Sequence, residues 1–194
     1  MKFNIPNVLT LLRIGLIPVF VVFFYLPVHW SSLATTAIFA LAGITDWLDG
    51  YLARKLGQTS AFGAFLDPVA DKLMVAIPLV MLVDKNPTQM PGLLLAIPAG
   101  IIIGREIVIS ALREWMAEIG ERTQVAVSVI GKIKTTTQMF AILLLLYKEP
   151  VGELSTADVG FVLLYLSAGL TLWSMIIYLK AAWPTLTNNN NDAK

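Results

Sequence analysis

Six runs of mostly apolar residues, each about twenty residues long, occupy nearly the whole chain. A helix of about twenty such residues crosses the hydrocarbon core of a bilayer. Only 14% of the residues are charged, against roughly 25% in a soluble domain. We therefore expect an all-α, polytopic membrane protein, a six-transmembrane-helix bundle forming one domain over residues 1–187, with a disordered polar tail at 188–194. The predicted spans are 8–26, 31–52, 64–83, 91–112, 124–147 and 157–181.

The lysines and arginines predict how the bundle is oriented. Seven of the fourteen fall at the N-terminus, in the loop after the second span, between the fourth and fifth spans, and at the C-terminal end, with Lys132 and Lys134 just beyond, whereas the opposite loops hold Lys85 and Lys148. Loops rich in Lys and Arg stay on the cytoplasmic side. Both termini, and any site beside the loop after the second span, should therefore face the cytoplasm.

Four aspartates interrupt the second and third spans: Asp46, Asp49, Asp67 and Asp71. Each would cost about 2.5–3.5 kcal/mol near the middle of a bilayer. Spacings of three and four residues place each pair on one helical face, so two helices joined by a short loop can bring all four carboxylates together. Hard oxygen ligands without His or Cys suit Mg²⁺ or Mn²⁺, and two such ions commonly serve phosphoryl transfer.

Small residues and one cation accompany these aspartates. Gly50, Ala53 and Gly63 remove side-chain bulk, so that a ligand can lie against the backbone, and Arg54 offers a charge suited to a phosphate. The alternative is internal ion pairing at solvated helix ends, for example Asp49 with Arg54. The joint register of the carboxylates and the small residues favours a metal and phosphate site.

From Asp46 to Asp71 the chain reads D-x2-D-G-x2-A-R-x8-G-x3-D-x3-D. This pattern resembles the signature of the CDP-alcohol phosphatidyltransferases. The resemblance implies a six-helix membrane enzyme, usually a homodimer, that displaces CMP from a CDP-linked lipid with an alcohol. It further implies that Asp46, Asp49 and Asp67 bind metal and that Asp71 is both a metal ligand and the general base. By the same resemblance, the CDP-diacylglycerol site would comprise Gly50, Ala53, Arg54, Gly63 and Thr59.

Basic residues of the fourth and fifth spans predict the acceptor alcohol. Cations near an intramembrane site are costly without an anionic partner, and an acceptor with its own phosphate would supply one. Glycerol 3-phosphate is therefore favoured over serine, choline or glycerol. The segments FNIPNVLTLLRI, REIVISALREWMAE and GKIKTTTQM also resemble bacterial members of the family that use this acceptor, in the cytoplasmic membrane. The candidate acceptor-binding residues are Arg105, Arg113, Lys132 and Lys134.

Each of these cations has an alternative role. Lys132 and Lys134 differ by about 200° around a helix, so they cannot both enter one pocket. We favour Lys132, which follows a glycine, and Lys134 could instead extend to lipid headgroups. Arg105 could pair with an acid such as Glu106, and Arg113 could lie at the membrane interface.

A polar stripe marks the first span, where Asn7, Thr10 and Arg13 recur every three residues. Polar residues on an apolar membrane helix should face protein or a water-filled site. We assign the stripe to the nucleotide side of the site, with helix capping as the alternative role of Asn7.

Other functions remain open at this point. Within the family, the acceptor could be inositol phosphate or phosphatidylglycerol, and outside it a divalent-cation transporter would also use intramembrane carboxylates. Intramembrane aromatic prenyltransferases resemble bundles of about nine helices, which six spans cannot supply. The net charge of +1 is uninformative about partners, and we expect no nucleic-acid partner.

Overall fold

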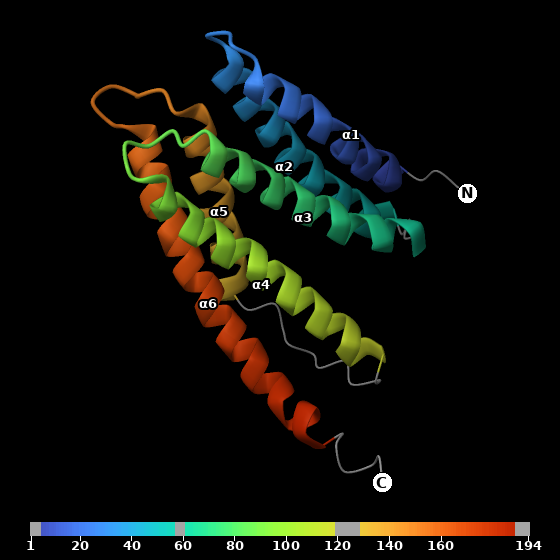
Figure 1. Cartoon of the computed structure of the whole chain (residues 1–194). Helices are drawn as coiled ribbons and strands as arrows, with labels where there is room; N and C mark the ends of the chain where they lie inside the picture. Colours follow the sequence, from blue (N-terminus) through green and yellow to red (C-terminus); the bar gives the residue numbers. More distant parts are fainter. Residues whose placement is uncertain (1–4, 57–60, 119–128, 189–194) are drawn as a thin grey trace.

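The computed structural model describes residues 5–56, 61–118 and 129–188, and every structural statement below concerns these ranges. They form six α-helices, as the apolar runs predicted (Figure 1). Besides the helices, the described residues contain only a single isolated β-bridge, between Val151 and Leu154. The helices are α1 (Ile5–Tyr25), α2 (Ser31–Leu56), α3 (Ala61–Asp84), α4 (Gly92–Glu118), α5 (Val129–Tyr147) and α6 (Thr156–Asn188).

Several helices are longer than their predicted spans. α4 continues to Glu118 and α6 to Asn188, because a helix can extend beyond the apolar run that crosses the membrane. Asn188, predicted as the first residue of a disordered tail, is therefore helical, and residues 189–194 lie outside the described ranges. The predicted start of the fifth span at residue 124 also lies outside them.

Four of the described helices are long and apolar enough to cross a membrane by themselves: α1, α2, α4 and α6. The apolar part of α5, Ile133–Tyr147, is shorter. α3 carries Asp67, Asp71 and Lys72 in its first half. The two helices that look least like membrane spans thus carry polar residues near one end, where a site can be built.

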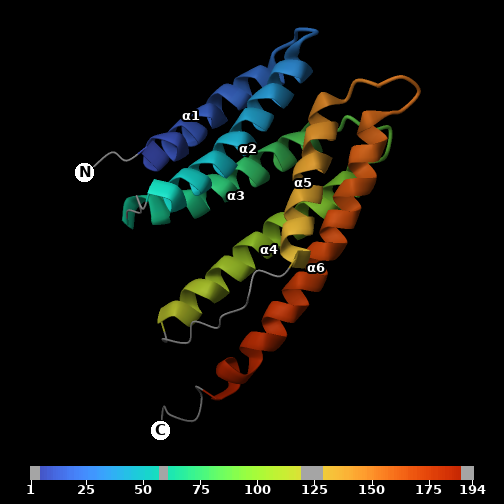
Figure 2. The ribbon, with the colours of Figure 1, turned by 180° about the vertical axis from the view of Figure 1, so that it is seen from behind.

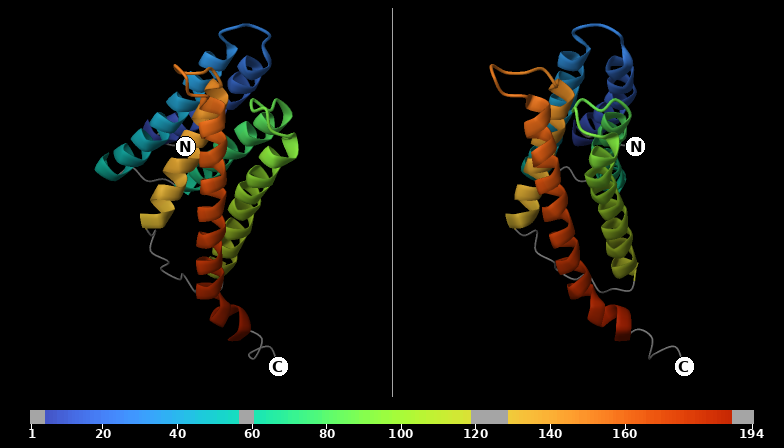
Figure 3. Two further views of the ribbon diagram at one scale, coloured as in Figure 1. Left: turned by 90° about the vertical axis from the view of Figure 1, so that its left-hand side faces the viewer. Right: turned by 60° about the vertical axis from the view of Figure 1, so that its left-hand side comes forward.

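The short connections 26–30, 85–91 and 148–155 all lie at one end of the bundle, as Figures 1 and 2 show from opposite sides. In Figure 3 the same end is uppermost, with α6 extending well below the other helices. The aspartates lie toward the opposite end, because Asp46 and Asp49 are in the last part of α2 and Asp67 and Asp71 in the first part of α3.

The helix contacts leave room for a site between α4 and α5. Each of these two helices packs against α3 and α6, but within the described ranges the backbones of α4 and α5 do not approach each other closely. α1 packs on α2 and α3, and α2 packs on α5. Side chains of five helices can therefore meet in the space that α4 and α5 leave.

Apolar side chains hold the bundle together between this space and the short connections. Phe39, Leu79, Ile102, Ile142 and Leu164 come from five helices and are fully buried. Burying such a side chain is worth about 1.5–3 kcal/mol relative to leaving it in water, while in lipid the gain comes from close packing.

Gly160 of α6 lies close to the backbone of α5. A Cβ atom at this position would lie 3.0 Å from the backbone oxygen of Ala141 and 3.0 Å from the backbone nitrogen of Leu145, both in α5. Small residues allow membrane helices to approach in this way. Gly160 therefore sets the close crossing of α5 and α6.

Candidate active site

Arg13 of α1 lies at the centre of the aspartate cluster. Its Nη1 is 2.5 Å from Oδ1 of Asp46 and 2.8 Å from Oδ1 of Asp71, and its Nη2 pairs with Oδ2 of Asp49. The Arg13 side chain is only 1% exposed, whereas those of Asp46 and Asp71 are 50% and 56% exposed. One buried guanidinium therefore joins α1 to carboxylates of both α2 and α3.

Thr10, one turn before Arg13, completes this link. Its hydroxyl lies 2.8 Å from Oδ1 of Asp67 and 3.4 Å from Oδ2 of Asp49, as donor to each. Asn7, Thr10 and Arg13 are all buried. The polar stripe thus faces protein, as predicted, and Thr10 and Arg13 contact all four aspartates; its role toward the nucleotide stays a prediction.

The donor chemistry of the cluster fits divalent cations. All four candidate ligands are carboxylates, the hard oxygen donors that Mg²⁺ and Mn²⁺ prefer. Among the described side chains, the guanidinium of Arg13 pairs with three of them and the hydroxyl of Thr10 contacts the fourth, which leaves an excess of negative charge. In the described part of the chain, no three His, Cys, Asp or Glu side chains are grouped as a ready-made metal site. The guanidinium lies among the carboxylates, so binding a metal would require Arg13 to give up some of its contacts.

Only some of the residues that accompany the aspartates are described. Gly50 is half-buried directly after Asp49, and Gly63 is buried at the start of α3. Ala53 and Arg54 belong to α2, but their side chains lie outside the described residues, and so does Thr59. Their proposed contacts with CDP-diacylglycerol stay predictions.

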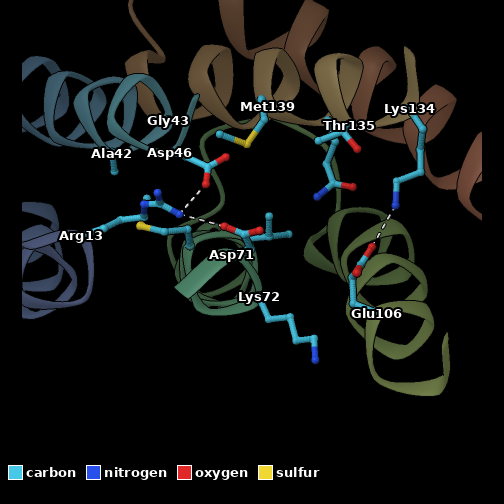
Figure 4. A pocket seen from close by; sticks show the side chains of 13 residues that line it. Arg13, Ala42, Gly43, Asp46, Asp71, Lys72, Glu106, Lys134, Thr135 and Met139 are labelled. Carbon is cyan, nitrogen blue, oxygen red and sulfur yellow. Dashed lines mark hydrogen bonds and ion pairs between the residues drawn. The ribbon is translucent and has the colours of Figure 1, made fainter. Parts of the chain in front are cut away.

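A cavity of about 290 Å³ extends from the aspartate cluster toward α4 and α5 (Figure 4). Figure 4 shows Arg13, Asp46 and Asp71 at one side, Lys134 and Glu106 at the other, and Thr135 and Met139 between them. The cavity thus connects the carboxylates to a buried cation. Its lining residues are Arg13, Ala42, Gly43, Asp46, Asp71, Lys72, Met74, Val75, Glu106, Lys134, Thr135, Gln138 and Met139.

Lys134 is buried at the far side of this cavity. Its Nζ donates to Oε1 of Glu106 at 2.8 Å, and Nη1 of Arg105 donates to the same oxygen at 3.0 Å. The alternative that Lys134 extends to lipid headgroups is therefore wrong, because Glu106 of α4 holds its ammonium inside the bundle. The favoured residue, Lys132, belongs to α5, but its side chain lies outside the described residues.

The two arginines of α4 lie behind Lys134 and do not line the cavity. Arg105 pairs with Glu106, the alternative considered for it, and also donates to Oγ of Ser174 at 3.3 Å. Arg113 is exposed and donates to the Tyr178 hydroxyl at 2.8 Å, and both guanidinium groups lie over the Tyr178 ring. A role in acceptor binding for these arginines stays a prediction, and they would act from outside the cavity as it stands.

Two functional candidates emerge from the structure and were not assigned to the site from the sequence: Glu106 as the partner of Lys134, and Gln138 in the cavity wall. Arg13 was assigned with its stripe to the nucleotide side, and its place at the centre of the aspartate cluster is new. Arg13 had a signal, since a cation within an apolar span needs a partner. Glu106 had a weaker one as an acid in the same kind of span. Gln138 had only its polarity, because nothing in its spacing says which helix it faces.

Comparison with known proteins gives a consistent result over the whole bundle. The family model for CDP-alcohol phosphatidyltransferases matches residues 3–173. A protein from Haemophilus influenzae is 56% identical over 190 residues, which cover 97% of this chain and 98% of the relative. Relatives from Pseudomonas fluorescens and Escherichia coli are 53% and 52% identical, over 94% of this chain and 92% and 96% of their own lengths. All three are named CDP-diacylglycerol–glycerol-3-phosphate 3-phosphatidyltransferase.

Proposed function

The chain belongs to the CDP-alcohol phosphatidyltransferase family, and from this premise we propose that it transfers the phosphatidyl group of CDP-diacylglycerol to sn-glycerol 3-phosphate. The products are phosphatidylglycerophosphate and CMP. The names of relatives more than half identical over nearly the full chain support both substrates. Membership of a transferase family also disfavours the divalent-cation transporter considered from the sequence.

The observation that carries the proposal is the single cavity that joins Asp46 and Asp71 to Lys134. Its volume of about 290 Å³ lies at the lower limit of the roughly 300–1,000 Å³ typical of small-molecule sites. Such a space suits a small phosphorylated alcohol better than a second whole lipid, so glycerol 3-phosphate is favoured over phosphatidylglycerol. The acceptor phosphate would pair with Lys134, while its free hydroxyl points toward the aspartates.

In this arrangement Asp71 is the general base. Its carboxylate lines the cavity, is half exposed, and is oriented by Nη1 of Arg13 at 2.8 Å. It would take the proton of the attacking acceptor hydroxyl, whose oxygen forms the new bond to the phosphorus that carries diacylglycerol. The bond from this phosphorus to the bridging oxygen breaks, and CMP leaves with that oxygen. Positioned acid–base catalysis of this kind contributes typically 10²–10⁴-fold.

Divalent metal ions are generally used by this family, and we propose that two of them, Mg²⁺ or Mn²⁺, are held by Asp46, Asp49, Asp67 and Asp71. When bound, they would neutralise the diphosphate and stabilise the charge that develops on the leaving CMP. Our candidates for CDP-diacylglycerol binding stay the same: Gly50, Ala53, Arg54, Gly63, Thr59, Asn7 and Thr10. Arg105, Arg113 and Lys132 would support the acceptor phosphate around Lys134.

The protein is a membrane protein, and we propose the bacterial cytoplasmic membrane, with both termini and the catalytic end of the bundle facing the cytoplasm. The position of the aspartates away from the short connections 26–30, 85–91 and 148–155 supports one functional end. Reporter fusions to each terminus, active only in the cytoplasm, test this orientation. We also propose one catalytic domain over residues 1–187. We propose further that the protein is a homodimer, and the test is the molecular mass of the protein extracted from the membrane together with its surrounding lipid.

One assay tests the central proposal. Purified protein receives CDP-diacylglycerol and Mg²⁺ or Mn²⁺, and glycerol 3-phosphate, inositol phosphate, phosphatidylglycerol or serine is offered separately while CMP release is followed. We expect metal-dependent release with glycerol 3-phosphate, at a rate well above that with any other acceptor. No release with glycerol 3-phosphate, or faster release with another acceptor, would refute the proposal.

A further inference from the structure

Gln138 of α5 is a buried polar residue whose polar atoms are incompletely paired. Its side chain is only 3% exposed and lines the cavity. Its Oε1 is shielded from solvent and has no hydrogen-bond partner in the described part of the chain. A buried amide oxygen without a partner lowers stability, so a residue of this kind in a cavity wall points to a ligand that can satisfy it.

The position of Gln138 along α5 indicates which part of an acceptor would meet it. Lys134 and Gln138 are four residues apart and therefore on one face of the helix, separated by about 6 Å along its axis. Lys134 lies at the Glu106 side of the cavity, and the aspartates lie at the other side (Figure 4). Met139, the neighbour of Gln138, reaches Gly43 of α2, three residues before Asp46. Gln138 therefore lies on the side of Lys134 that faces the reacting end of the cavity.

The chemistry of the amide indicates what kind of group would bind there. A phosphate dianion can only accept hydrogen bonds, so it cannot satisfy Oε1, whereas a hydroxyl both donates and accepts and can pair with either end of the amide. Across the cavity from Gln138, Ala42 and Gly43 of α2 are apolar. Met139, next to Gln138 on α5, is apolar too, and its methyl would lie 3.2 Å from a Cβ on Gly43. Thr135, the nearby polar residue of the same helix, donates its hydroxyl to the backbone oxygen of Gly131.

We infer that Gln138 is a specificity-determining residue that accepts a hydrogen bond from the middle hydroxyl, the one on C2, of glycerol 3-phosphate. The inference rests on the proposed function. With the phosphate at Lys134 and the attacking C1 hydroxyl toward Asp71, the C2 hydroxyl is the remaining polar group and lies between them. A site built to bind a hydroxyl discriminates against the analogue that lacks it, because the buried amide is then left unpaired.

The test compares glycerol 3-phosphate with its 2-deoxy analogue, 1,3-propanediol monophosphate, which keeps the phosphate and the attacking hydroxyl. We expect kcat/KM for CMP release by the wild type to be about tenfold higher with glycerol 3-phosphate, the value of one net hydrogen bond. In Gln138→Met this preference should fall to about one, because only the reaction with glycerol 3-phosphate slows. Met139→Leu, which alters the same wall without touching the amide, should keep the wild-type preference.

Activity with the deoxy analogue also reports that each variant is folded and binds CDP-diacylglycerol. Equal kcat/KM for the two acceptors in the wild type would overturn the inference whether or not the variants accumulate. A full preference retained in Gln138→Met would overturn it as well. Both results leave the proposed function intact. If the wild type released no CMP with glycerol 3-phosphate and none with the deoxy analogue, the proposed function and this inference would both be refuted.

Discussion

Removing Arg13 should make the stability of this protein depend on metal. The guanidinium is the only described side chain that forms ion pairs with Asp46, Asp49 and Asp71, and it is almost fully buried. In Arg13→Met an apolar side chain of similar length remains, but the carboxylates lose their positively charged partner. Nε of Arg13 is buried without a partner among the described residues, so removing this atom breaks no hydrogen bond.

The expected loss can be estimated from the contacts. Removing one partner of a fully buried ion pair costs about 3–5 kcal/mol. Because Asp46 and Asp71 are half exposed and only Asp49 is buried, the lower limit applies, about 3 kcal/mol. For a chain of this size, 1 kcal/mol shifts Tm by about 2–4 °C, so Tm of Arg13→Met without metal should fall by about 6–12 °C.

Divalent cations should reverse much of this loss. In the wild type a metal competes with Arg13 for the carboxylates, whereas in Arg13→Met it does not. A free metal concentration one hundred times Kd adds about 2.7 kcal/mol to the free energy of unfolding. Mg²⁺ or Mn²⁺ should therefore raise Tm more in the variant than in the wild type.

The measurement is thermal unfolding of purified protein in lipid nanodiscs, with chelator and with increasing Mg²⁺ or Mn²⁺. The matched control is Lys55→Met, which removes an exposed cation of α2 that lies over the Tyr51 ring, and it should leave Tm within about 2 °C of the wild type. A Tm of Arg13→Met equal to that of the wild type in chelator, or an equal rise with metal in both proteins, would refute the reasoning.

Four further predictions follow from the site and the fold. Asp71→Asn should lower CMP release by at least about 10²-fold, the loss expected for a general base, while CDP-diacylglycerol binding is retained; loss of binding to the same extent would assign Asp71 to the nucleotide site instead. Lys134→Met should raise KM for glycerol 3-phosphate more than Arg113→Ala does, because only Lys134 lines the cavity, and the reverse order would place the acceptor outside it. Gly160→Ala should destabilise the protein by about 1–3 kcal/mol through overpacking, whereas Gly169→Ala, with open space around it, should be neutral or slightly stabilising; equal thermal shifts would contradict the close crossing of α5 and α6. A chelator should abolish CMP release and Mg²⁺ or Mn²⁺ should restore it, and activity that survives exhaustive chelation would exclude a metal role.

Much of the architecture followed from the sequence, because lipid leaves a chain few choices. Apolar runs of about twenty residues must be helical to satisfy their backbone groups, and the described residues form six helices. The aspartates were also predictable as a group, since spacings of three and four residues put each pair on one face whatever the surroundings. Helix ends were less predictable, as α4 and α6 show, because helices can continue past the apolar region.

Only the tertiary structure decided which partner each polar residue meets. Spacing gives the face of a helix on which a residue lies, but rotation and register against the other helices come from side-chain packing. The sequence therefore could not tell that Arg13 reaches carboxylates of two helices, that Glu106 holds Lys134 inside the bundle, or that Arg105 and Arg113 both lie over the ring of Tyr178. The sequence determined which chemical groups are available to the site. Their geometry was determined by how α1, α4 and α5 pack around α2 and α3, the helices that carry the aspartates.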